Sequence, residues 1–251
     1  MIYFIGAGPG DPELITVKGA RLIAAAGVVI YAGSLVNRRL LDGCKPEAEI
    51  HNSAAMTLDE ILSVMKRAHD AGLDVARVHT GDPALYGAIQ EQMDALTALD
   101  IPFAVVPGVS SFFAAAAAIP HELTLPGVTQ TVILTRVEGR TLVPAGEKLA
   151  VLAAHGATMC IFLSVHLIEQ VMEELMKGSY TRETPVVVVE RASWPEQQVI
   201  RSTIGDIAGR VKSAGISKTA LIMVGSVFGA DYTPSKLYDG SFAHEFRDKK
   251  E

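Results

Sequence analysis

Asp82 is the side chain best placed for chemistry, because it stands in a Gly-Asp-Pro turn between a predicted strand at 74–79 and a predicted helix at 84–99. A similar turn, Gly6 to Pro12, follows a predicted strand at 2–5. Open α/β sheets bind ligands at the carboxyl ends of their strands, where backbone groups remain free. Two such turns from one sheet therefore predict a small-molecule site.

The negative charge of Asp82 restricts the ligand. A carboxylate repels phosphate, but it accepts hydrogen bonds from hydroxyl or ammonium groups. A positively charged nucleoside cofactor therefore fits it better than a polyphosphate. The Asp-Pro pair is equally typical of a helix N-cap followed by proline at the first helical position, and the two roles can coexist.

The spacing of Gly6, Gly8 and Gly10 invites comparison with dinucleotide-binding loops. That fingerprint needs a further glycine where this chain has Asp11, and Pro9 removes a backbone N–H that a pyrophosphate would require. An NAD site is therefore disfavoured. A P-loop is excluded because Gly-Lys-Ser/Thr does not occur.

The composition is that of a globular protein, with 251 residues of which 49% are apolar and 20% charged. The net charge of -6 argues against general affinity for nucleic acid. Cys44 and Cys160 are isolated and the histidines are scattered, so we expect reduced thiols and no metal. The chain has no signal-peptide pattern and its apolar run around 114–118 is too short for a bilayer, so a cytoplasmic, non-membrane protein is expected.

The elements that must position these turns fall into two domains. Strands are predicted near 2–5, 28–31, 48–51, 74–79 and 103–106, alternating with helices near 16–26, 35–41, 57–71 and 84–99, which indicates a mostly parallel sheet. A second set of strands is predicted near 129–135, 158–163, 185–190, 197–202 and 219–224, with helices near 166–177 and 205–213. The short turn between 185–190 and 197–202 favours a mixed sheet. The expected division is an N-terminal α/β domain over 1–119, a C-terminal α/β domain over 120–230 and a polar tail over 231–251.

Four motifs in order carry a resemblance to a known family. They are Gly6–Thr16, Thr80–Pro83, Val106–Ser111 and Val186–Arg191, and they resemble the tetrapyrrole methylases, the S-adenosylmethionine-dependent methyltransferases of corrin and sirohaem synthesis. The resemblance extends from Met1 to about Phe228. The stretches Tyr31–Val36 and Thr131–Thr141 resemble the subgroup that methylates C11 of precorrin-4 or cobalt-precorrin-4, with Leu142 where proline is usual.

The resemblance implies that S-adenosyl-L-methionine lies folded between two α/β domains of the tetrapyrrole methylase type. The implied cofactor-binding residues are Pro9, Thr80, Gly81, Asp82, Leu85, Tyr86, Ser110, Ser111, Phe162, Leu163, Ala192, Thr219 and Ala220. Core packing is an equal alternative for Tyr86 and Phe162. Trp194 is expected to cover the cleft or a dimer surface.

The implied reaction is in-line methyl transfer from a sulfonium, in which the enzyme mainly positions the acceptor carbon. Because the corrin precursor carries many carboxylates, arginines should bind it. The substrate-binding candidates are Asp11, Ser34, Arg136 and Arg140, with Arg38, Arg39 and Arg77 as weaker ones. The catalytic candidates are Asp82 and Glu138, and Glu138 could instead fix its loop through an arginine. The resemblance also implies a homodimer.

Two alternatives remain open. One keeps the fold but changes the acceptor to another corrin position or to a component of translation, although the acidic balance speaks against RNA. The other is a nucleoside-binding regulatory or NAD-linked module, against which Pro9 and Asp11 argue.

Overall fold

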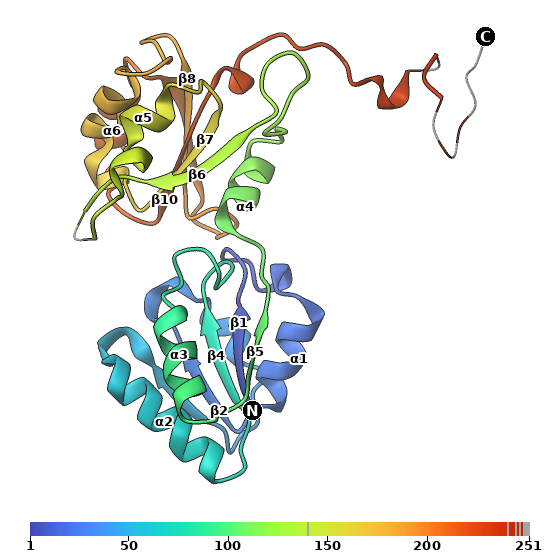
Figure 1. Ribbon diagram of the computed structural model, residues 1–251, viewed down its shortest axis with the longest axis vertical. Coiled ribbons are helices and arrows are strands. Elements are labelled where there is room, and N and C mark those ends of the chain that lie inside the picture. Colours follow the sequence, from blue (N-terminus) through green and yellow to red (C-terminus); the bar gives the residue numbers. More distant parts are fainter. Residues whose placement is uncertain (140, 240, 244, 246, 248–251) are drawn as a thin grey trace. The chain divides into compact units, whose positions relative to one another are not determined.

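The computed structural model describes residues 1–139, 141–239, 241–243, 245 and 247, which form two compact units (Figure 1). The first unit comprises Met1–Ala118 together with Arg191–Gln198, and the second comprises Ile119–Glu190 and the chain from Val199 onward. Within the described residues, no helix has the length and apolar character needed to cross a membrane.

The first unit contains a five-stranded parallel sheet, which confirms the predicted parallel arrangement. Its strand order is β3-β2-β4-β1-β5. The strands are β1 (Ile2–Gly6), β2 (Val28–Tyr31), β3 (Glu49–Asn52), β4 (Val75–His79) and β5 (Phe103–Val106). The helices are α1 (Val17–Ala25), α2 (Leu58–Asp70), α3 (Gln90–Ala98) and α4 (Ser111–Ala118).

The central strands β1, β2 and β4 are buried on both faces, because their successive side chains point to opposite sides of the sheet and helices cover each side. Phe4 of β1 packs with Met65 of α2 and Leu96 of α3 in one apolar cluster. Its neighbour Ile5 packs with Ile23 of α1 in another. Helices α2 and α3 therefore cover one face and α1 covers the other (Figure 1).

Helix α2 begins with the capping box that the sequence predicts. Thr57 N donates to Glu60 Oε2 at 2.7 Å, and Glu60 N donates to Thr57 Oγ1 at 3.3 Å. The two bonds satisfy donors that the first helical turn would otherwise leave without partners.

Two predicted helices of the first unit differ in the structure. Residues 35–41 form no α-helix but parts of two 3-10 helices, Gly33–Leu35 and Arg38–Leu41, and Asn37 Oδ1 caps the second by accepting from Arg39 N. The helix predicted at 84–99 begins only at Gln90, because the backbone turns left-handed at Tyr86 (φ 58°) and Ala88 (φ 49°). The loop after β4 is therefore longer than predicted.

The second unit contains the mixed five-stranded sheet that the sequence predicts. Its strands are β6 (Val132–Arg136), β7 (Thr158–Phe162), β8 (Pro185–Glu190), β9 (Gln198–Thr203) and β10 (Ala220–Val224), in the order β6-β7-β10-β8-β9. Strand β10 runs antiparallel to β7 and β8, whereas β6 and β7 are parallel. The helices are α5 (Leu149–Ala153), α6 (Ile168–Leu175) and α7 (Ile207–Ser213), and their apolar residues pack against Ile161, Val188 and Ile222.

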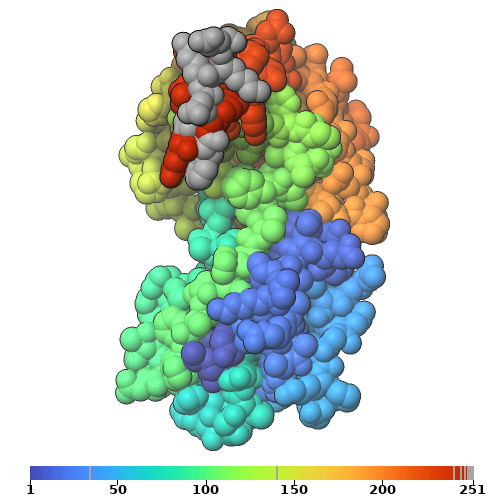
Figure 2. All heavy atoms as spheres, turned by 90° about the vertical axis from the view of Figure 1, so that its right-hand side faces the viewer, coloured from blue at the N-terminus to red at the C-terminus, as the bar shows by residue number. Residues whose placement is uncertain are grey.

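The segment that follows Phe228 can be followed by its red colour in Figures 1 and 2, and in Figure 1 it extends away from the sheet of the second unit. Thr233 N donates to Pro126 O at 3.4 Å. Residues 231–239 are exposed, and Lys236–Tyr238 form a 3-10 helix. This polar segment adds little apolar burial to the unit.

Candidate functional site

The carboxyl ends of β1, β4 and β5 meet at three glycines. A Cβ atom added to Gly108 would lie 2.2 Å from Gly81 O and 2.7 Å from Gly6 Cα. Gly81 N donates to Gly8 O at 2.8 Å, and Gly8 N donates to Gly81 O at 3.3 Å. The two turns predicted from the sequence are therefore in direct backbone contact with each other and with the turn after β5.

Asp82 joins two of these turns through its carboxylate. Its Oδ2 accepts from Gly108 N at 2.9 Å and its Oδ1 accepts from Ala84 N at 2.8 Å. The second bond caps a turn and not a helix, because α3 begins only at Gln90. The predicted helix N-cap is therefore replaced by a link between loops. Each carboxylate oxygen has two lone pairs, so a ligand hydroxyl or ammonium group can still bind.

The loop after β1 is held by the segment 191–198, which belongs to the first unit although it is distant in sequence. Trp194 Nε1 donates to Pro9 O at 3.0 Å, and Asp11 N donates to Ser193 Oγ at 3.0 Å. The indole lies so close that a Cβ on Gly10 would approach it to 2.1 Å. Trp194 thus holds the loop after β1, a role that its place in the sequence does not indicate.

Several candidate cofactor residues have unusual backbone conformations. Tyr86, Leu163 and Thr219 have φ values of 58°, 53° and 55°. Arg191 (φ 46°) and Ser193 (φ 69°) flank the candidate Ala192. Left-handed conformations of non-glycine residues cost roughly 1–3 kcal/mol and cluster at ligand sites. The strain in these loops is consistent with a binding role.

The candidates of the second unit lie at one end of its sheet. Arg136, the last residue of β6, is the partner of Phe162, the last residue of β7. Because β10 runs antiparallel to β7 with Ile222 opposite Ile161, its first residue Ala220 lies beside the end of β7. The sheet thus gathers Arg136, Phe162, Leu163, Thr219 and Ala220. Leu163 is 64% exposed, so its apolar side chain is available to a ligand.

Arg136 donates to three carbonyl oxygens within its own loop. The acceptors are Val137 O at 3.3 Å, Thr141 O at 3.1 Å and Leu142 O at 3.3 Å. The guanidinium therefore fixes the loop in which the half-buried Glu138 stands. Arg140 lies outside the described residues, as does the side chain of Ser34, whose backbone is part of the 3-10 helix Gly33–Leu35.

The remaining candidates lie around the turns of the first unit. Asp11 Oδ1 accepts from Glu13 N at 2.9 Å and so caps the 3-10 helix Pro12–Leu14. Thr80 and Leu85 are half-buried, Ser110 is buried, and Ser111 begins α4. Apart from Arg140 and the side chain of Ser34, the candidates therefore lie in two places. They stand at the carboxyl edge of the parallel sheet or at the end of the second sheet that carries Arg136 and Phe162.

Arg77 is an interior residue and not a surface arginine. It is 5% exposed, and its guanidinium donates to Gln92 Oε1 at 3.1 Å and to Ser53 Oγ at 3.0 Å. Burial lowers its pKa to about 10. Its hydrogen bonds stabilise the packing of α3 on the sheet, so this weaker substrate candidate has a structural explanation.

His79 should make the protein sensitive to acid. Burial, followed by the charge of Arg77, lowers its pKa from 6.5 to about 3, and its Nε2 has no hydrogen-bond partner among the described residues. Between these two pH values the imidazole of His79 is protonated in the unfolded chain but neutral in the folded chain. The free energy of unfolding therefore decreases as the pH falls. Two pH units below the unfolded pKa, the loss should reach about 2.7 kcal/mol. Urea unfolding measured at several pH values should show this loss of stability. In the His79→Leu variant the free energy of unfolding should depend less on pH. An imidazole NMR signal of His79 that titrates near 6.5 would contradict the assignment.

Among the residues that the structure describes, no group of three or more His, Cys, Asp or Glu side chains could hold a metal ion. Both cysteines are free thiols. Burial raises the pKa of the Cys160 thiol to about 12, which makes it unreactive at neutral pH.

A parallel and a mixed five-stranded α/β unit, with glycine-rich turns at the carboxyl edge of the first, define a class of two-unit α/β proteins with a candidate ligand site at that edge. Sequence comparison narrows the class, because the profile of the family described as "Tetrapyrrole (Corrin/Porphyrin) Methylases" matches residues 1–208. The chain belongs to this family.

Individual relatives agree with this assignment. The chain is 56% identical to cobalt-precorrin-4 C(11)-methyltransferase of Methanocaldococcus jannaschii, over 98% of this chain and 95% of the relative. It is 49% identical to precorrin-4 C(11)-methyltransferase of Pseudomonas aeruginosa, over 98% of each.

Solved structures show the same fold. A cobalt precorrin-4 methyltransferase superposes with a TM-score of 0.89 at 49% identity, over 91% of this chain and 96% of that chain. Uroporphyrin-III C-methyl transferase of Thermus thermophilus, complexed with S-adenosyl homocysteine, gives a TM-score of 0.74 at 28% identity, over 91% and 93%.

Proposed function

We propose that this protein is an S-adenosylmethionine-dependent methyltransferase that methylates C11 of precorrin-4 or cobalt-precorrin-4 in cobalamin biosynthesis. The observation that carries the proposal is the identity of 56% over 98% of the chain with a relative of that name. The structure supports it through the turns at Gly6, Gly81 and Gly108, whose close packing forms a rigid edge for a ligand.

S-adenosylmethionine would supply a methyl group already activated on a sulfonium. In the first unit we assign its binding to Pro9, Thr80, Gly81, Asp82, Leu85, Tyr86, Ser110, Ser111 and Ala192. In the second unit we assign it to Phe162, Leu163, Thr219 and Ala220. The carboxylate of Asp82 suits hydroxyl or ammonium groups, and the exposed, strained Leu163 suits an apolar surface.

The protein's part in the reaction is to orient two reactants and to exclude water. Asp82 contributes by fixing the turns after β4 and β5 to each other. Arg136 contributes by shaping the loop that carries Glu138, and Asp11, Ser34 and Arg140 remain proposed contacts of the anionic substrate. Glu138 is the candidate proton acceptor, and it is half-buried beside the end of β6.

The test is incubation of the purified protein with S-adenosylmethionine and precorrin-4, metal-free and cobalt-loaded in parallel. Mass spectrometry should show one added methyl group, and NMR of the labelled product should place it at C11. Calorimetry with S-adenosylhomocysteine measures cofactor binding independently. Cofactor binding without transfer to either substrate would reject the proposed acceptor and retain the methyltransferase assignment. No binding would reject both.

The family resemblance also supports a homodimer in the cytoplasm as part of this proposal. Sedimentation of the purified protein should give twice the mass of one chain. A monomer with full methyltransferase activity would remove the dimer from the proposal.

A further inference from the structure

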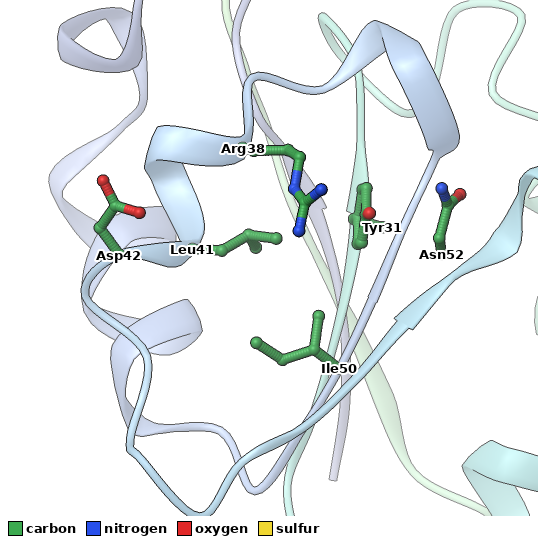
Figure 3. Close-up of a pocket in the computed structure, with 6 residues that line it drawn as sticks. All are labelled: Tyr31, Arg38, Leu41, Asp42, Ile50 and Asn52. Atoms are coloured by element: carbon green, nitrogen blue, oxygen red, sulfur yellow. The ribbon is translucent and has the colours of Figure 1, made fainter.

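A cavity of about 410 Å³ opens beside the ends of β2 and β3, apart from the turns described above (Figure 3). It is lined by Tyr31, Arg38, Leu41, Asp42, Ile50 and Asn52. Tyr31 and Asn52 are the last residues of parallel strands, so the cavity lies at the same sheet edge as the turns at Gly6 and Gly81. The volume is within the usual range of small-molecule sites.

The wall that carries Arg38 is connected to the loop after β1. Asn37 Nδ2 donates to Gly10 O at 2.9 Å, and Asn37 also caps the 3-10 helix Arg38–Leu41. A ligand in the cavity would therefore lie beside the loop to which we assign part of the cofactor site.

The side chain of Arg38 points into the cavity. Figure 3 shows its guanidinium in the space between Leu41, Tyr31 and Ile50. Arg136 and Arg77 differ in this respect, because the first bonds to carbonyls of its own loop and the second to buried groups of the core. Of these arginines, Arg38 is the one that faces an open volume.

The surroundings of Arg38 suit a carboxylate attached to an apolar ring. A guanidinium binds a carboxylate through two parallel hydrogen bonds. Leu41 and Ile50 line the part of the cavity below it in Figure 3 and provide apolar surface there. Asn52 Oδ1 accepts from Ala54 N at 3.0 Å, which leaves the amide N–H groups as the part of Asn52 able to donate to an anion.

Asp42 limits the charge that the cavity can accept. In Figure 3 it lies beyond Leu41 from Arg38. Its carboxylate would repel a second anionic group brought into the same cavity. The cavity therefore fits one carboxylate with its apolar attachment better than a cluster of carboxylates.

We propose that this cavity is a substrate subsite, in which Arg38 binds one carboxylate side chain of the anionic tetrapyrrole and Leu41 and Ile50 contact the adjoining ring. This inference rests on the proposed function, because that function supplies the anionic tetrapyrrole. The proposal places one contact with the carboxylates of the substrate in the segment after β2, in addition to the contacts proposed for the loop after β6.

The test compares Arg38→Gln with Arg21→Gln, since Arg21 has the same charge, is exposed on α1 of the same unit and does not line the cavity. The probe is uroporphyrin, a polycarboxylate tetrapyrrole, titrated by absorbance. Arg38→Gln should weaken its binding about 10-fold or more, as expected for a lost bidentate ion pair, and Arg21→Gln less than about 2-fold. Arg38→Lys should recover only part of the loss, because an ammonium lacks the planar fork. Asp42→Asn should strengthen binding.

Equal losses in the two glutamine variants would show general charge attraction and overturn the subsite. Unchanged binding by Arg38→Gln, or no binding of uroporphyrin by the unsubstituted protein, would overturn it as well. The affinity for S-adenosylhomocysteine, measured by calorimetry, and the thermal unfolding temperature should be the same in both variants as in the unsubstituted protein. These controls distinguish loss of the subsite from damage to the fold. If the unsubstituted protein binds the porphyrin and S-adenosylhomocysteine but methylates neither form of precorrin-4, the proposed acceptor fails while the Arg38 comparison still decides the subsite.

Discussion

Gly108→Ala is expected to destabilise the first unit by more than about 3 kcal/mol, the range of severe overpacking, and to abolish cofactor binding. The added Cβ would lie 2.2 Å from Gly81 O and 2.7 Å from Gly6 Cα. The three atoms nearest to the added Cβ all belong to backbone, so the clash cannot be relieved by the movement of a flexible side chain. Relief of the clash requires the ends of β1, β4 and β5 to separate, and the bond from Gly108 N to Asp82 Oδ2 would be strained with them.

Alanine substitutions at Gly81 and Gly43 serve as controls for Gly108→Ala. At Gly81, a Cβ would have 3.7 Å to its nearest neighbour, but φ is 61°, so Gly81→Ala should cost about 1–2 kcal/mol through backbone strain alone. At Gly43, nothing lies within 4 Å of an added Cβ, and Gly43→Ala should change stability by less than about 0.5 kcal/mol. Urea unfolding of the three variants should therefore rank Gly108 above Gly81 and Gly81 above Gly43. Equal stability of Gly108→Ala and Gly43→Ala would refute the close packing of the turns.

Local pattern was sufficient for most of the fold. Strand and helix alternation predicts the parallel sheet because the central strands are apolar on both faces, as at Phe4 and Ile5 of β1. The capping box at Thr57 predicts the start of α2 because all its atoms lie within one helical turn. The pattern fails at 35–41, where the side chain of Asn37 favours a capped 3-10 turn, and at 84–89, where left-handed residues delay α3.

The contacts between the residues of the candidate site were harder to predict from the sequence than the fold. The glycine turns could be located, but their mutual contact depends on three strand ends that are far apart in the chain. Arg136 could be singled out, but not its use of carbonyl acceptors within its own loop. The contact between Trp194 and Pro9 joins residues 185 positions apart, and no local signal predicts such a pair.

Trp194→Phe is expected to weaken the binding of S-adenosylhomocysteine about 5- to 10-fold, the equivalent of one lost hydrogen bond of ordinary strength. The substitution keeps an aromatic ring beside Gly10 but removes the Nε1 donor, so Pro9 O loses its partner at 3.0 Å. Ser193→Ala should act in the same direction, because Asp11 N loses its acceptor Ser193 Oγ. The loop after β1 would then sample more conformations, and a ligand would have to order it on binding.

Calorimetry measures this loss directly, and fluorescence shows where it arises. Trp194 is the single tryptophan of the chain, so its emission reports on the loop that it holds. Titration of the unsubstituted protein with S-adenosylhomocysteine should change that emission. Tyr238→Phe also removes one polar atom from an aromatic ring, but on a side chain that is 83% exposed, and it should leave the affinity unchanged. Undiminished affinity in Trp194→Phe would mean that the loop keeps its binding conformation without this bond. The positioning role would then belong to the close packing of the three glycines and to Asp82 alone.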